Sequence, residues 1–178
     1  MRKKALANFL RKKSEKYHEP IHMLIGILCA LIVAHFYEVS SLSKLIMIGI
    51  LGNLIPDVDH LIYLFIYGRK SEYAKIVKKY LKGKEFRNFY KFMRDNHKAN
   101  TGIYSHNIFA LLLSIFLAWY LGESRDRAGF YTFFVSWSSH YVFDMFEDLL
   151  FFKKLNPNWY MRFNKIKRDI TQGFGKEK

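Results

Sequence analysis

Two short segments of this 178-residue chain carry histidine and aspartate at spacings that suit metal ligation. In SSHYVFD, His140 and Asp144 are four residues apart, so a helix presents both on one face. In LIPDVDH, Asp57 and His60 share a face at a separation of three, whereas Asp59 points elsewhere unless the helix is broken. Imidazole and carboxylate groups together bind divalent ions, most typically Zn²⁺, with Mn²⁺ or Fe²⁺ as alternatives. The spacing therefore predicts a metal site.

The complete predicted site takes residues from four separate apolar segments. Its metal ligands are predicted to be His22, Asp57, Asp59, His60, His106, His140 and Asp144, holding one to three ions. Weaker candidates are His18 and His97, which lie in basic segments and are expected to be solvated, and Glu147 and Asp148, which we expect nearer the membrane interface. Asp57 and Asp59 are also catalytic candidates, because the one that does not bind metal can act as a general base.

The segments that must position these residues are long and apolar. They cover residues 21–39, 42–67, 103–121 and 128–152, and a helix needs about 20 mostly apolar residues to cross a bilayer. An ionisable side chain inside such a span costs about 2.5–3.5 kcal/mol on insertion scales, so those present here indicate function. The sequence predicts an all-α fold, in which residues 1–178 form one integral membrane domain built on a four-span helical bundle.

The distribution of basic residues predicts the orientation of these spans. With four spans, 26 of the 29 Lys and Arg residues fall on one side of the membrane and 3 on the other. The positive-inside rule then places both termini and the loop of residues 68–100 in the cytoplasm. In this orientation, all four spans bring their His and Asp residues to the cytoplasmic half of the bilayer. The formal net charge of +14 is then explained by topology and anionic lipid headgroups, and nucleic acid is not needed as a partner.

The loop of residues 68–100 has helical apolar periodicity on both sides of Gly83. Its pattern predicts one or two basic amphipathic helices that lie on the membrane surface with their apolar face towards lipid. We expect the cytoplasmic tail, residues 153–178, to lie there too, with Trp159 and Tyr160 at headgroup level. Cys29 is expected to be a small core residue. The remaining polar residues of note, Ser105, Ser138 and Ser139, are expected to ease helix packing.

These motifs, taken in order, resemble a known family. HMLIG (His22, Gly26), LIPDVDH, YSHN (His106) and SSHYVFD are similar to motifs of the membrane-bound, metal-dependent hydrolases, also called LexA-binding, inner-membrane-associated or YdjM-like hydrolases. The resemblance covers about residues 22–145. That family usually has a second His five residues before the one matching His106, where this chain has Thr101; the nearest His is His97. The family is remotely similar to zinc-dependent phospholipase C, which implies metal-dependent hydrolysis in the inner membrane and favours a phosphoester substrate.

The leading hypothesis from the sequence is a membrane-embedded hydrolase that acts on a phosphoester, such as a phospholipid headgroup at the cytoplasmic leaflet. A bound metal would lower the pKa of a water molecule to about 7 and stabilise developing negative charge. Alternatives are a small cation transporter that uses the same cluster and a non-catalytic adaptor that recruits a partner through its basic face. Haem ligation by paired His is disfavoured by the surrounding carboxylates. A transporter with so few spans would need to form an oligomer.

Overall fold

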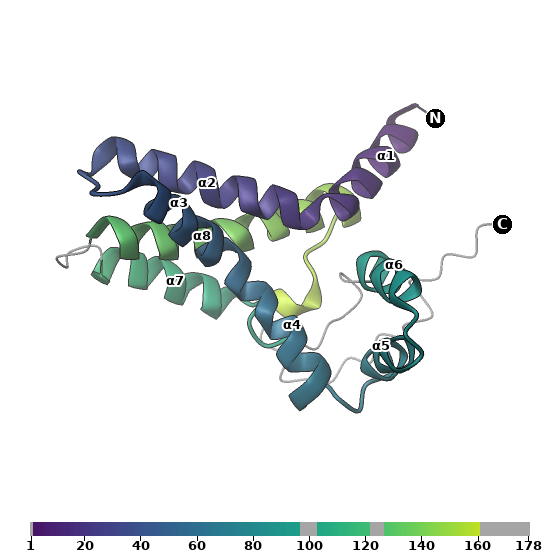
Figure 1. Ribbon diagram of the computed structural model, residues 1–178. Helices are drawn as coiled ribbons and strands as arrows, with labels where there is room; N and C mark the ends of the chain where they lie inside the picture. Colours follow the sequence, from purple (N-terminus) through teal and green to yellow (C-terminus); the bar gives the residue numbers. More distant parts are fainter. Residues whose placement is uncertain (1, 97–102, 122–126, 161–178) are drawn as a thin grey trace.

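The computed structural model describes residues 2–96, 103–121 and 127–160, and within these ranges the secondary structure is entirely helical (Figure 1). The longer helices are α1 (Arg2–Lys16), α2 (His18–Phe36), α3 (Leu42–Leu54), α5 (Glu72–Lys82), α6 (Phe86–Asn96), α7 (Ile108–Leu121) and α8 (Arg127–Glu147). Shorter elements are the 3₁₀ turn Ile55–Asp57, α4 (Val58–Ile62), the π-helical turns Tyr63–Tyr67 and Asp148–Phe152, and the 3₁₀ turn Pro157–Trp159.

Four of these helices form a bundle in which α8 packs against α2, α3 and α7 (Figure 1). Small residues let the helices approach closely. A Cβ atom on Gly26 of α2 would overlap the backbone of Gly49 in α3, and one on Gly49 would overlap the carbonyl oxygen of Gly26. Gly52 has the same relation to the carbonyl of Phe133 in α8. Gly26, the glycine of HMLIG, thus serves helix packing, as small residues do in membrane bundles.

Hydroxyl groups make further contacts between the helices. Ser138 of α8 pairs with Ser114 of α7 at 2.8 Å, and Ser139 lies 3.4 Å from the sulfur of Cys29 in α2. Both serines also donate to a carbonyl one turn earlier in α8. The predicted packing role of Ser138 and Ser139 is confirmed, and Cys29 is buried as expected.

The bundle has polar residues inside and large apolar residues outside. The fully buried side chains include His22, Asn53, Thr132, Ser136 and His140. The outer faces expose Leu24, Leu28 and Ile32 of α2, Met47 and Leu51 of α3, Leu112, Leu113 and Phe116 of α7, and Phe130, Val142 and Phe146 of α8. Two helices are long and apolar enough to cross a membrane, His18–Phe36 and the continuous run Leu42–Tyr67. The helix α7 is apolar but shorter, at 14 residues.

The predicted third span begins later than the sequence pattern indicates. Residues 103–107 are not helical, and α7 starts only at Ile108. The reason is a cap, because the side-chain oxygen of Asn107 accepts hydrogen bonds from the backbone N–H groups of Phe109 and Ala110, both at 2.9 Å. His106 therefore lies on the loop before α7 and not within a helix.

The loop of residues 68–100 does contain two helices separated at Gly83, but the apolar face of α5 does not point towards lipid. Tyr73, Ala74 and Val77 are buried in a cluster with Phe92 of α6 and with Leu64 at the end of the second apolar run. Burial raises the pKa of the Tyr73 hydroxyl, which donates a hydrogen bond to the sulfur of Met93 at 3.2 Å. Apolar surface is buried equally well against protein, so amphipathic periodicity alone did not distinguish these two environments.

Candidate metal centre

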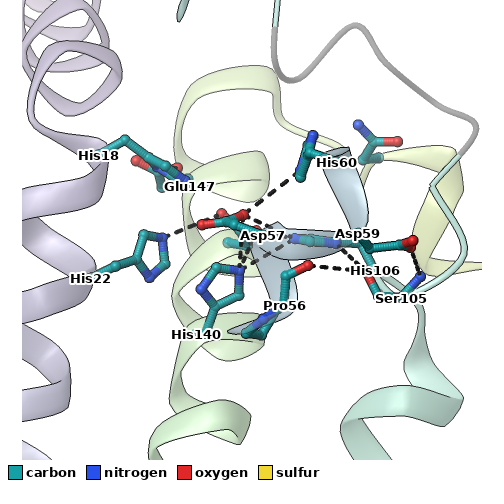
Figure 2. Close-up of polar contacts among 12 residues, drawn as sticks. His18, His22, Pro56, Asp57, Asp59, His60, Ser105, His106, His140 and Glu147 are labelled. Atoms are coloured by element: carbon teal, nitrogen blue, oxygen red, sulfur yellow. Dashed lines mark hydrogen bonds and ion pairs between the residues drawn. The ribbon is translucent and has the colours of Figure 1, made fainter. Parts of the chain in front are cut away.

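The break in the second apolar run turns its two aspartates in different directions. Residues Ile55–Asp57 form a 3₁₀ turn at Pro56, and α4 follows directly. The carboxylate of Asp57 points into the bundle, whereas that of Asp59 points towards the loop before α7 (Figure 2). There Asp59 Oδ2 accepts a hydrogen bond from the backbone N–H of Ser105 at 2.7 Å. Asp59 therefore fastens the segment that carries His106.

Four side chains from three parts of the chain meet at one point. Asp57 Oδ1 lies 3.7 Å from Nε2 of both His106 and His140. Asp144 Oδ2 lies 3.4 Å from His106 Nε2 and 3.5 Å from His140 Nε2. The two Nε2 atoms are 3.3 Å apart. His60 Nε2 approaches the same Asp57 oxygen at 3.7 Å. These atoms are close enough to one another to share a single ion.

A second group lies beside the first, on α2 and α8. His18, His22 and Asp144 each offer a ligand atom within 4.8 Å of the others. The other oxygen of Asp144, Oδ1, is 4.0 Å from His22 Nε2, and Glu147 Oε2 is 3.7 Å from His18 Nδ1. Ser14 of α1 donates a hydrogen bond to Glu147. Asp144 thus faces both groups, one carboxylate oxygen towards each.

The segment after α8 closes the cluster from one side. Asp148 Oδ2 accepts hydrogen bonds at 2.8 Å from the backbone N–H of Asn156 and from the indole Nε1–H of Trp159. A cavity of about 30 Å³ remains, enough for one or two water-sized species. It is lined by His18, Asp57, His60, Ile103, His106, Asp144, Asp148, Asn156, Asn158 and Trp159. No lysine or arginine from the described ranges is in this lining.

Access to the cluster is uneven. The side chains of His140 and His22 are 0% exposed, and that of Asp144 is 6% exposed. Asp57 and His60 are more open, at 28% and 16%. The centre is therefore reached from the side of Asp57 and His60, which come from the break in the second apolar run.

Several expectations from the sequence need correction. His18 is not solvated, because α2 begins there and buries the ring against Glu147 and His22. Glu147 and Asp148 are not interfacial, since both are at most 4% exposed. Trp159 is buried at 3% exposure and contacts Tyr141 and His106, whereas Tyr160 is exposed. These contacts join segments far apart in sequence, which local periodicity does not reveal. His97 lies outside the described residues.

The structure also adds residues that the sequence analysis did not place in the site. Asn53 Oδ1 is 2.7 Å from His22 Nδ1, and Ser105 Oγ is 2.9 Å from His106 Nδ1. Ser105 had been expected to ease helix packing, but it lies on the loop before α7. A signal for Asn53 was present, because it is a buried-type polar residue in an apolar run, one turn before Asp57.

Comparison with known proteins identifies the family. The family model described as YdjM inner membrane protein matches residues 19–150. The chain belongs to the YdjM inner membrane protein family. Together with the two long apolar helices, membership of the YdjM family places the protein in a membrane. Neither the curated proteins nor the solved structures include a match to this YdjM-family chain.

Proposed function

We propose that this YdjM-family protein is a membrane-embedded, metal-dependent hydrolase. The observation that carries the proposal is the meeting of Asp57 Oδ1, Asp144 Oδ2, His106 Nε2 and His140 Nε2, with contacts of 3.3–3.7 Å between them. Two carboxylates and two imidazoles held this closely repel one another unless positive charge lies between them. A divalent ion supplies that charge, and this mixture of ligands suits Zn²⁺.

The donor set fits two ions better than one. His106, His140 and Asp57 would hold the first, His18 and His22 the second, and Asp144 would bind both because one of its oxygens faces each group. Glu147 is the additional ligand nearest His18. When bound, such ions polarise a substrate oxygen and generate a hydroxide-like nucleophile near neutral pH.

The exposure of the residues favours catalysis over a purely structural role. A structural metal site is closed on all sides, whereas a catalytic one keeps an open position. Here the buried residues His22, His140 and Asp144 form the floor, and the side of Asp57 and His60 is open. His60 is placed to accept a proton from a water molecule and to hold it beside the Asp57 carboxylate.

We further propose a four-span topology with both termini and helices α5 and α6 in the cytoplasm. The support is the inverted arrangement of the bundle, in which α2, α3, α7 and α8 all expose large apolar side chains and enclose polar ones. The test replaces Cys29 with Ala and introduces Ser40→Cys or Asn88→Cys, both at exposed positions. A membrane-impermeant thiol reagent added to intact cells should label position 40 and not position 88; the opposite pattern would reverse the orientation.

The proposed substrate is a phosphoester such as a phospholipid headgroup at the cytoplasmic leaflet, because the open side lies at the same end of the bundle as α5 and α6 (Figure 1). The test is hydrolysis of phospholipids and of a generic phosphodiester by zinc-loaded protein in detergent, with His140→Ala as the inactive variant. Ser138→Ala is the matched control, because Ser138 is on the same helix but contacts α7. Equal turnover by chelator-treated protein would refute metal dependence, and cleavage of carboxyl esters alone would refute the substrate class.

A further inference from the structure

Two polar residues behind the candidate centre contact the outer nitrogen of a histidine. Asn53 is fully buried, and its side-chain oxygen lies 2.7 Å from Nδ1 of His22. Ser105 Oγ lies 2.9 Å from Nδ1 of His106. In both histidines the other nitrogen, Nε2, faces Asp144. The hydrogen bond at one ring nitrogen determines which nitrogen carries the proton of a neutral imidazole.

The surroundings of Asn53 determine which way its hydrogen bond to His22 runs. The side-chain NH₂ of Asn53 donates to the backbone carbonyl of Ser136 at 2.8 Å. The reverse amide orientation would set two oxygens against each other at that position, inside the bundle. The oxygen of Asn53 must therefore face His22 and can only accept, so Nδ1 of His22 must carry the hydrogen.

The same reasoning applies to Ser105. Its hydroxyl donates to the carbonyl of Pro56 at 3.3 Å, so its remaining role towards His106 is that of an acceptor. Nδ1 of His106 then carries the hydrogen and Nε2 presents its lone pair to the cluster. Asp59 holds the backbone N–H of Ser105 and so keeps this hydroxyl in place.

We propose that Asn53 and Ser105 are positioning residues that fix His22 and His106 as Nδ1–H tautomers, so that both Nε2 lone pairs face the centre. This inference rests on the proposed metal site for its purpose. Its geometry rests on hydrogen bonds outside that site. Outer hydrogen bonds of this kind orient metal-binding histidines and raise their basicity. They act before any ion arrives, because both partners belong to the folded chain.

The test is NMR of the full-length, histidine-labelled (¹³C, ¹⁵N) protein in detergent, kept metal-free with a chelator at about pH 8. His22→Gln and His106→Gln identify the two sets of signals by their disappearance. We expect both rings to carry hydrogen on Nδ1 and none on Nε2, although the Nε2–H form is commoner for free histidine in water. An Nε2–H ring, a mixture of the two tautomers or a doubly protonated ring would overturn the inference.

Variants then separate tautomer control from a general structural role. Ser105→Ala should turn His106 into a tautomer mixture and weaken Zn²⁺ binding about 10- to 100-fold, while Ser105→Thr keeps the hydroxyl and should restore both values. Asn53→Ala should do the same to His22 alone. The control is Ser138→Ala, which removes a hydroxyl that also donates to a backbone carbonyl but faces α7. Loss of Zn²⁺ binding with unchanged tautomers would refute the inference.

The two proposals can fail separately. If the wild-type protein binds no Zn²⁺, the hydrolase proposal fails, yet the tautomers measured in metal-free protein still decide the roles of Asn53 and Ser105. If Asn53→Ala does not fold, the Ser105 variants decide for His106, since Ser105 lies on a loop and is only partly buried.

Discussion

Replacing Asp144 with Asn should remove both proposed ions, because this carboxylate is the only described side chain that belongs to both groups of ligand atoms. Its Oδ1 faces His22, and its Oδ2 faces His106 and His140. A four-ligand zinc site is worth about 10–16 kcal/mol, so one ligand contributes about 3 kcal/mol, or about a 100-fold change in dissociation constant. Asp144→Asn should weaken both ions by this factor.

Asp57→Asn is the matched comparison, because Asp57 belongs to one group only. The assay is elemental analysis of detergent-purified protein after dialysis at a fixed free zinc concentration. Wild-type protein should retain two ions per chain, Asp57→Asn about one and Asp144→Asn almost none. If Asp144→Asn retains as much zinc as Asp57→Asn, Asp144 does not bridge the two groups.

The metal-free protein supplies a second test of the same reasoning. Without an ion, Asp144 places a negative charge next to the carboxylate of Asp57 and beside several lone pairs. Asp144→Asn removes that charge, so the metal-free variant should unfold at a temperature equal to or above that of metal-free wild type. A lower unfolding temperature would mean that Asp144 stabilises the fold itself, and zinc loss would then say nothing about ligation.

Three further predictions concern the surroundings of the site. Asp59→Ala should weaken zinc binding about 10-fold without removing an ion, because it releases the Ser105 loop; complete loss in a zinc titration would make Asp59 a ligand after all. Gly26→Val should lower the free energy of unfolding by at least about 1–3 kcal/mol through overlap with α3, whereas Gly83→Ala meets mainly a flexible side chain and should be nearly neutral in thermal unfolding. Because burial raises the pKa of Tyr73 above its ordinary value of about 10, its contribution to stability should be complete below pH 10 and decline as pH rises beyond it; Tyr73→Phe should lack this decline in a comparison of unfolding at pH 9 and 11.

The motifs that share one helix face could be predicted from the sequence. His140 and Asp144 follow from a separation of four, and the different directions of Asp57 and Asp59 follow from their adjacent positions around a helix. The spacing of His18 and His22 carries the same signal, but the basic surroundings of His18 led to the expectation of a solvated ring. Charge describes where a segment lies and not how each side chain packs.

Other features depend on contacts between distant segments and could not be predicted. Trp159 was expected at the headgroups because tryptophan is common there, yet Asp148 binds its indole inside the protein. The apolar face of α5 was expected to meet lipid, yet Leu64 and Phe92 cover it. In both cases a side chain has two environments of similar polarity, and only the tertiary fold chooses between them. The loop containing His106 differs, because the Asn107 cap is a local signal that was available.

The contact between Ser14 and Glu147 joins residues 133 positions apart, and the centre beside it takes residues from α2, the second apolar run, the loop before α7 and α8. During synthesis, the early parts enter the bilayer with a histidine and an aspartate whose partners do not yet exist. The polar interior is complete only once α8 has been made and packed. Ion capture would then be a late step of biogenesis, and a chain starved of zinc would present membrane proteases with an unfinished substrate.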